Sequence, residues 1–227
     1  MDIRFLGHAS FELVEGDARV LVDPFLTGNP KAAAGPDELE ATHILLTHGH
    51  GDHIGDAESI AKRTGAMVVA VPEITSELSE AGVENVADPN LGGTVKFDWG
   101  WVKLVPAWHT STTPKGASPG VAAGLLIGIG GKTVYHLGDT ALFSDMKLIA
   151  QRGDPIDVAL VPIGGHYTMD RIDAVTACEF IAAGTVIPCH YNTFPPIETD
   201  VEAFKSDVES QTSSEVVILE PGETFSA

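Results

Sequence analysis

The sequence predicts an α/β protein in which two β-sheets pack against each other and helices cover their outer faces. Three observations support this fold class. The chain has 227 residues, of which 44% are hydrophobic and 20% are charged, so it can bury a core without disulfides. Short strand-like segments and helical segments recur in both halves of the chain. No linker rich in Pro, Gly and Ser divides it, so residues 1–227 are predicted to form a single domain.

The first half is predicted to open with three short strands, with a hairpin turn at Glu15-Gly16-Asp17. Two helices follow later, one ending at the C-cap residue Gly65 and one running from Pro72 to Gly82. The first of these helices places Ile54, Ala57, Ile60 and Ala61 on one face. The predicted strands are Ile3–Leu6, Ser10–Val14, Arg19–Val22, Thr42–Leu46, Ala66–Val71, Thr94–Asp98 and Trp101–Val105.

The second half repeats this alternation of strands and helices, and the loop Pro114–Pro119 joins it to the first. Gly130-Gly131 is a hairpin signal. Thr199, with Glu202 three residues later, predicts a capping box for a helix that runs through Val208. The other predicted elements are strands Val121–Ile129, Thr133–Leu137, Asp157–Ile163, Thr185–Pro188 and Val216–Leu219, and helices Leu142–Ala150 and Ile172–Ala183, the latter stopped by Gly184.

The charge of the chain restricts its partners. Thirteen Lys and Arg residues against 32 Asp and Glu residues give a net charge of −19. This charge repels phosphate backbones, so we expect no nucleic-acid partner.

The apolar run Val121–Ile129 is too short to cross a bilayer, and no basic segment followed by an apolar one begins at Met1. We therefore expect a cytoplasmic protein with a small-molecule substrate and no membrane partner. The sequence is compatible with a homo-oligomer. Cys178 and Cys189 are expected to be partly buried thiols.

The histidines carry the main functional signal. His48, His50, Asp52 and His53 form a His-x-His-x-Asp-His motif directly after the strand Thr42–Leu46. Four side chains that can bind a metal ion, placed in a tight turn at a strand end, indicate a cation site. Imidazole and carboxylate ligands without thiolate favour Zn, Mn or Fe over a structural zinc held by cysteines.

Three more residues of the same chemical kind follow later strands. His109 comes after Trp101–Val105, Asp139 lies in Leu-Gly-Asp-Thr after Thr133–Leu137, and His190 lies in Cys-His-Tyr after Thr185–Pro188. A lone cluster of histidines can be a solvated polar turn. The three additional residues at strand ends favour a metal centre.

These motifs resemble those of the metallo-β-lactamase superfamily, and the resemblance extends over the whole chain. It implies a four-layer αβ/βα sandwich, the metallo-β-lactamase fold, with a dinuclear site at the edges of the two sheets. Within that family, Leu6-Gly7-His8-Ala9-Ser10-Phe11 and the stretch from Pro162 to Met169 are similar to a branch of small metal-dependent hydrolases. The branch resembles the ascorbate-phosphate lactonases and, more distantly, the phospholipase that acts on N-acyl-ethanolamine lipids. The resemblance implies that one ion binds His48, His50 and His109, and that the other binds Asp52, His53 and His190, with Asp139 bridging.

A hydrolase that uses a metal-bridging hydroxide is the expected function. Two divalent ions about 3.5–4 Å apart can hold a bridging water, lower its pKa and clamp the attacked and leaving oxygens. Zn and Mn are the expected metals. Asp52 is also the expected proton acceptor. No serine nucleophile elbow and no phosphate-binding Walker motif occur in the sequence. The substrate is expected to be a small, anionic ester, lactone or phosphodiester.

Two alternatives stay open on the sequence. One is an oxidoreductase relative of the flavodiiron proteins, in which the second histidine of the turn is typically Glu; here that residue is His50, and no flavodoxin-like domain follows. The other is a non-catalytic protein that only binds metal, although all the residues expected to bind metal are present.

The other histidines differ in their expected roles. His43 is expected to pack in its strand, whereas His8 is expected near the site. His136 suits a role in supporting the ligands as well as one in the core. His166 follows a strand and two glycines, so we expect it to enter the mouth of the cavity and act as an acid or hydrogen-bond donor. Asp23, after Arg19–Val22, either reaches the site or forms a turn. Cys189 is expected to face the core.

Overall fold

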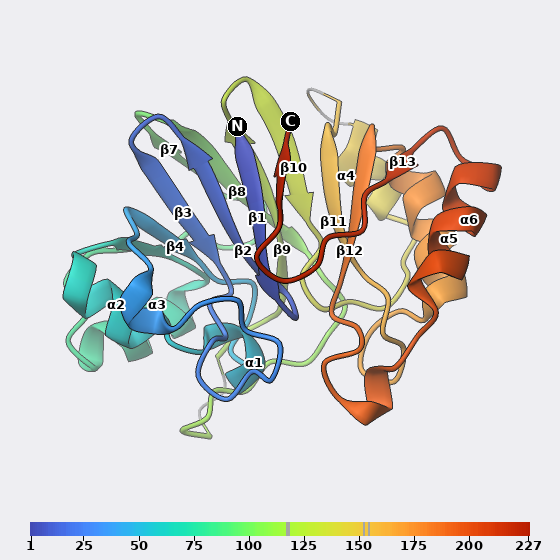
Figure 1. The fold of residues 1–227 in the computed structure, drawn as a ribbon. Coiled ribbons are helices and arrows are strands. Elements are labelled where there is room, and N and C mark those ends of the chain that lie inside the picture. The colour runs from blue at the N-terminus through green and yellow to red at the C-terminus, as the bar shows by residue number, and fades with distance from the viewer. Residues whose placement is uncertain (117–118, 152, 154) are drawn as a thin grey trace.

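Two seven-stranded mixed sheets form the centre of the protein, and helices lie on their outer sides (Figure 1). The computed structural model describes residues 1–116, 119–151, 153 and 155–227. The arrangement confirms the predicted fold class, a four-layer αβ/βα sandwich. Residues 117 and 118 of the predicted join Pro114–Pro119 lie outside the described residues.

The first sheet has the strand order β14-β1-β2-β3-β4-β5-β6. Its strands are β1 (Asp2–Gly7), β2 (Ser10–Glu15), β3 (Ala18–Val22), β4 (His43–Leu45), β5 (Met67–Val69), β6 (Val86–Ala87) and β14 (Thr224–Ser226). β1, β2 and β3 are joined antiparallel, and β3 to β6 are parallel. As a result, β1, β3 and β4 all end at the same edge of the sheet.

The second sheet has the order β13-β12-β11-β10-β9-β8-β7. Its strands are β7 (Thr94–Phe97), β8 (Gly100–Pro106), β9 (Ala123–Ile129), β10 (Lys132–His136), β11 (Val158–Pro162), β12 (Thr185–Cys189) and β13 (Glu215–Val216). β9 pairs antiparallel with both β8 and β10, whereas β10 to β13 are parallel. β8, β10, β11 and β12 therefore end at one edge.

The helices cover the outer faces of the two sheets. Buried side chains of α2 and α3 belong to the same cluster as those of the first sheet, and α5 and α6 pack with the second sheet. The helices are α1 (Gly51–Ile54), α2 (Ala57–Thr64), α3 (Pro72–Glu80), α4 (Met146–Gln151), α5 (Arg171–Ile181) and α6 (Val201–Gln211), and two short 3₁₀ turns lie at Pro36–Glu38 and Pro195–Ile197.

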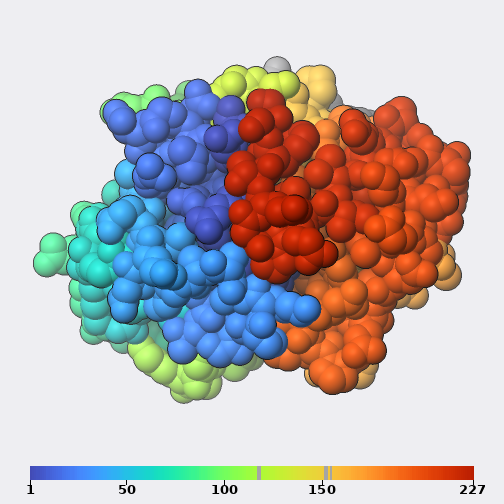
Figure 2. Space-filling model, viewed as in Figure 1, coloured from blue at the N-terminus to red at the C-terminus, as the bar shows by residue number. Residues whose placement is uncertain are grey.

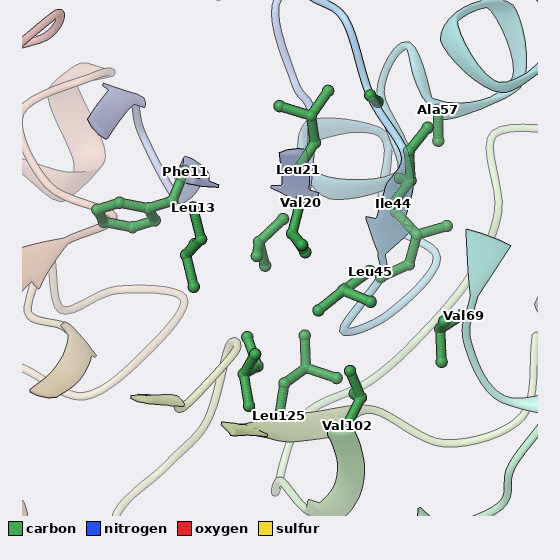
Figure 3. Close-up of a cluster of buried hydrophobic side chains, with 14 of the residues drawn as sticks. Phe11, Leu13, Val20, Leu21, Ile44, Leu45, Ala57, Val69, Val102 and Leu125 are labelled. Atoms are coloured by element: carbon green, nitrogen blue, oxygen red, sulfur yellow. The ribbon is translucent and has the colours of Figure 1, made fainter. Parts of the chain in front are cut away.

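The main core lies between the sheets, because alternate residues of each strand point inward. Figure 3 shows Val102 and Leu125 of the second sheet facing Val20 and Leu45 of the first, and all four are fully buried. The intervening residues point the other way: Tyr135 of β10, for instance, packs in the cluster beneath α5 and α6. Burial of both faces explains the near-continuous apolar runs of β9 and β11.

The two ends of the chain meet in the first sheet. β14 pairs antiparallel with β1, from Asp2 opposite Ser226 to Arg4 opposite Thr224. In Figure 2 the C-terminal residues, in red, lie against the N-terminal ones, in blue. β6 and β14 were not predicted, because a strand of two or three residues carries no periodic pattern, and neither were the two 3₁₀ turns.

Several predicted boundaries need correction. Asp200, not Thr199, caps α6: its side chain accepts the backbone N–H of Ala203 at 2.9 Å. α5 ends at Ile181, before the expected stop at Gly184, and its C-cap residue Ala182 takes the left-handed conformation. The predicted strand Val216–Leu219 overlaps β13 only at Val216, because β13 runs from Glu215 to Val216. The predicted helix Leu142–Ala150 begins later, since α4 runs from Met146 to Gln151. Gly65 is left-handed at the end of α2, as predicted.

Candidate metal centre

The residues predicted to bind metal come together where the strands end. β4, β8, β10 and β12 each end within three residues of a predicted ligand, and α1 adds two more. Because the strands that carry these loops end at one edge of each sheet, the loops of both sheets face the same space. These residues are His48 and His50 after β4, Asp52 and His53 in α1, His109 after β8, Asp139 after β10 and His190 after β12.

Glycines allow the ligand turn to pack closely. A Cβ on Gly49 would lie 2.9 Å from Pro119 Cγ, and one on Gly55 would lie 2.4 Å from Pro24 O. Gly55 also has φ of 40°, a region that side chains disfavour. Gly49 therefore lets the turn pack against Pro119, and Gly55 lets the chain leave α1 close to Pro24. The turn that was predicted from Thr47 to His53 contains most of this short helix.

The ligand atoms form two groups, each with atoms within 4.8 Å of one another. The first group is His48, His50, His109 and Asp139, and the second is His8, Asp52, His53 and His190. Except for His8, this division follows the ligand sets that the family resemblance implies.

Asp139 lies between the two groups. Its Oδ2 is 3.4 Å from His109 Nε2 and 3.2 Å from His190 Nε2, and its Oδ1 is 3.3 Å from His53 Nε2. Burial alone would raise the pKa of this carboxyl, but His190 and His53 hold it well below its ordinary value. An ionised carboxylate between two sets of imidazoles has the position required of a bridging ligand.

Buried polar atoms at the centre lack hydrogen-bond partners. Among the residues that the structure describes, these include His53 Nε2, His190 Nε2 and Asp139 Oδ1. Such atoms cost free energy unless something satisfies them. Imidazole nitrogens and carboxylate oxygens that converge in this way fit divalent transition-metal ions.

Asp23 supports two of the proposed metal-binding histidines, His53 and His48, through hydrogen bonds. Its carboxylate accepts hydrogen bonds from the Thr47 backbone N–H at 2.9 Å and hydroxyl at 2.6 Å, and from His53 Nδ1–H at 2.7 Å. The Nε2 atom of His53 is thereby left free for a metal ion. The Thr47 hydroxyl oxygen also lies 3.0 Å from His48 Nδ1, which orients the second ring in the same way. The sequence left Asp23 undecided between a turn and this role.

His8 contacts the second group and lies deep in the site. Its Nε2–H donates to Asp52 Oδ2 at 3.2 Å, and its Nδ1 lies 2.9 Å from Thr193 Oγ1. Its ring lies 4.1 Å from that of His190. Burial lowers the pKa of His8 to about 4, so the ring is neutral near pH 7. Because Nε2 already donates to Asp52, His8 orients this carboxylate.

His136 and His43 lie outside both groups. His136 Nε2–H donates to Ala9 O at 3.0 Å, and its Nδ1 accepts the Gly138 N–H at 3.0 Å. The ring therefore holds the turn that presents Asp139. His43 packs edge-on against Phe97 and Trp99, and the Cys189 thiol is buried in the core, as its place in the strand predicts.

A cavity of about 470 Å³ opens over the two groups, within the range of small-molecule sites. None of its lining residues in the described part of the chain is Lys or Arg. A larger cavity, of about 800 Å³ beside β7 and β8, contains none of the ligand atoms. The lining residues of the smaller cavity are His8, His50, Asp52, His109, Thr110, Asp139, Tyr167, His190, Phe194 and Pro196.

His166 lies beside this cavity and is not among its lining residues. Its side chain is exposed, and its ring stands perpendicular to that of Tyr167, with ring centroids 4.5 Å apart. His166 was expected to enter the mouth of the cavity, but Tyr167, the next residue of the loop after β11, lines the cavity instead. Tyr167, Phe194 and Pro196 were not predicted as site residues. Their types carry no metal signal, and only the fold brings them to the cavity.

Comparison with known proteins gives a consistent result. Residues 18–191 match the family model of the β-lactamase superfamily domain. A UPF0173 metal-dependent hydrolase of Thermus thermophilus is 48% identical over 99% of this chain and 98% of its own, and one of Thermococcus onnurineus is 52% identical over 97% of each. The structure of Igni18, a metallo hydrolase of Ignicoccus hospitalis, superposes with a TM-score of 0.90 at 38% identity, covering 100% of this chain and 98% of that one. No helix among the described residues is long and apolar enough to cross a membrane.

Proposed function

This chain belongs to the metallo-β-lactamase superfamily, as a UPF0173 metal-dependent hydrolase, and from that premise we propose that it cleaves a small ester, lactone or phosphodiester at a dinuclear metal centre. The position of Asp139 carries the proposal, because its two carboxylate oxygens lie within 3.4 Å of histidines from both groups. Zn and Mn suit this set of ligands. When bound, two such ions would supply a bridging hydroxide and polarise the bond that is cleaved.

The chain's own residues hold and orient this centre. His48, His50 and His109 would hold one ion, Asp52, His53 and His190 would hold the other, and Asp139 would be shared. We assign Asp52 a second role as proton acceptor, since it lines the cavity and its side chain is 35% exposed. The hydrogen bond from His8 fixes Oδ2 of this carboxylate.

The cavity favours a small molecule over a polymer. Its volume of about 470 Å³ suits a compact substrate, and the net charge of −19 opposes nucleic acid. A negative charge on the substrate would be attracted by the metal ions alone, because the lining contains no Lys or Arg in the described part of the chain. We also propose His166 as an acid or hydrogen-bond donor, because its ring contacts that of Tyr167, which lines the cavity.

A substrate screen tests the proposal directly. The purified protein is stripped with a chelator, reloaded with Zn or Mn, and assayed against panels of lactones, phosphodiesters and thioesters. We expect turnover in at least one panel, loss of turnover on chelation and recovery on reloading. Turnover that persists after every metal has been removed would contradict the proposal.

Elemental analysis tests the number of ions separately. We expect about two transition-metal ions per chain after saturation, because the available ligands exceed what one four-coordinate site uses. A limit of one ion per chain, with no further loading at higher metal concentration, would contradict a dinuclear centre.

A further inference from the structure

The cavity has one apolar wall beside its ligand residues. Phe194, Pro196 and Tyr167 line the cavity together with the two ligand groups. The Phe194 ring stands edge-on to His8, with ring centroids 5.7 Å apart. These three lining residues are called the apolar wall, and its Phe194 ring lies beside His8 of the second ligand group.

Hydrogen bonds fix the loop that carries Phe194 and Pro196. Asn192 accepts the Thr199 N–H on its side-chain oxygen at 2.8 Å, and its own backbone N–H donates to Ile197 O at 2.9 Å. Ile197 is fully buried and anchors the 3₁₀ turn that contains Pro196. This part of the wall is consequently formed before any ligand binds.

The loop that carries Tyr167 is held as well. The Gly165 N–H donates to Met169 O at 3.0 Å, and the Met169 N–H donates to Thr140 O at 3.0 Å. The second bond ties this loop to the residue that follows Asp139. Tyr167 nevertheless leaves 54% of its surface exposed, so a ligand that packs on its ring would bury apolar area.

The cavity offers no positively charged side chain that could bind an anionic group at the apolar wall. The chain has 13 Lys and Arg residues, and none of them is among the described residues that line the cavity. A carboxylate placed against Phe194 would lose its hydration without gaining a partner, in the field of a protein with a net charge of −19.

We propose that the substrate carries an uncharged apolar group, about the size of an aromatic ring, against Phe194, Pro196 and Tyr167, and that any negative charge is confined to the group at the metal ions. This inference rests on the proposed hydrolase function and adds the chemical class of the substrate's second half. It makes Phe194 and Tyr167 specificity-determining residues.

Three phosphonates test the inference through binding, without the need for turnover. Methylphosphonate, phenylphosphonate and 4-carboxyphenylphosphonate present the same anionic group to the metal-loaded protein, and calorimetry gives each Kd. Burial of a ring at roughly 25 cal/mol per Å² supports at least tenfold tighter binding of the phenyl compound than of the methyl compound. The added carboxylate should cancel most of that gain.

Variants locate the effect. Phe194→Ala and Tyr167→Ala should each reduce the preference for phenyl over methyl severalfold, because each removes a ring that lines the cavity. Tyr167→Ala is the safer variant for folding, because its side chain is largely exposed, and thermal melts check both. Ile172→Ala is the matched control, since Ile172 is 68% exposed and lies outside the cavity.

The outcomes separate this inference from the function on which it rests. Equal binding of the methyl and phenyl compounds, or tighter binding of the carboxylated one, overturns the apolar wall and leaves the hydrolase proposal standing. A metal-loaded protein that binds no phosphonate and hydrolyses none of the screened substrates overturns the proposed function as well.

Discussion

Among the described residues, Asp139 is the carboxylate that lies between the two ligand groups and can offset the charge of both proposed ions. We expect Asp139→Ala to lose metal and activity together, since it removes a ligand from both sites and leaves buried imidazoles facing each other. Metal content by elemental analysis and turnover on a screened substrate measure the two effects. Full metal retention in this variant would show that the bridge is misplaced. Asp145→Ala, which changes a carboxylate outside the centre, is the control.

Asp23 holds His53 by a hydrogen bond, so at the proposed metal centre it would be a positioning residue. Asp23→Asn keeps the shape of the side chain but weakens the acceptor for His53 Nδ1–H, which lies 2.7 Å from Oδ2. Loss of such a supporting hydrogen bond typically costs 10–100-fold in metal affinity. Metal titration should therefore show that reduction for one of two ions. An unchanged affinity for both would indicate that Asp23 serves only the Thr47 turn.

His166 poses a question that one substitution can answer. If it acts as an acid or hydrogen-bond donor, His166→Ala should keep both metals and its Tm but lose about 100-fold in turnover. The structure adds a second variant, because Tyr167 is the neighbouring side chain that lines the cavity. A loss in Tyr167→Phe alone would assign the role to the tyrosine hydroxyl. Normal turnover of His166→Ala would contradict a catalytic role for His166.

The element that presents two of the ligands, α1, depends on its flanking glycine. Gly55 and Gly65 both have positive φ, but a Cβ has no room at Gly55 and meets nothing within 4 Å at Gly65. Gly65→Ala should cost roughly 1–2 kcal/mol of unfolding free energy from the backbone alone. Gly55→Ala should cost roughly 1–3 kcal/mol more from overpacking, and it should also reduce metal loading. Denaturant unfolding and metal content measure these effects, and equal values for the two variants would contradict the explanation.

Most elements that carry the site were predictable because their signals are local. The apolar run before His48 and the hairpin at Gly130-Gly131 predict strands from neighbouring residues, and the His-x-His-x-Asp-His turn shows its chemistry in six positions. The two-residue strand β6 has no such signal. β14 forms only because it pairs with β1 at the other end of the chain.

What the sequence left open in the site depends on contacts between distant residues. Asp23 and His53 are separated by 30 positions, and their hydrogen bond is visible only after folding. His166 and Tyr167 are adjacent, so a one-residue pattern could not decide which enters the cavity. The positive φ of 36° at His166 belongs to the turn that presents Tyr167.

At the scale of the whole molecule, the metal ions would link the two sheets. His48, His50, Asp52 and His53 follow β4, whereas His109, Asp139 and His190 follow strands of the second sheet. A ligand that binds only the folded state stabilises it by about 2.7 kcal/mol at 100 times its Kd. Chelation should therefore lower the Tm by several degrees, and scanning calorimetry with and without metal measures this shift. An unchanged Tm after complete metal removal would show that the sheets hold the empty loops unaided.

The net charge of −19 acts on substrate capture over longer distances. Acidic residues far from the cavity repel an anionic substrate at low ionic strength, where the Debye length is about 30 Å at 0.01 M, and hardly at 0.15 M, where it is about 8 Å. Raising the salt over this interval should raise kcat/KM for an anionic substrate and leave an uncharged analogue unaffected, so the uncharged compound is the control for effects of salt on the enzyme itself. Steady-state kinetics on the pair measures the difference. A rate that falls with salt for the anion alone would mean that the local field of the metal centre outweighs the acidic surface even at long range.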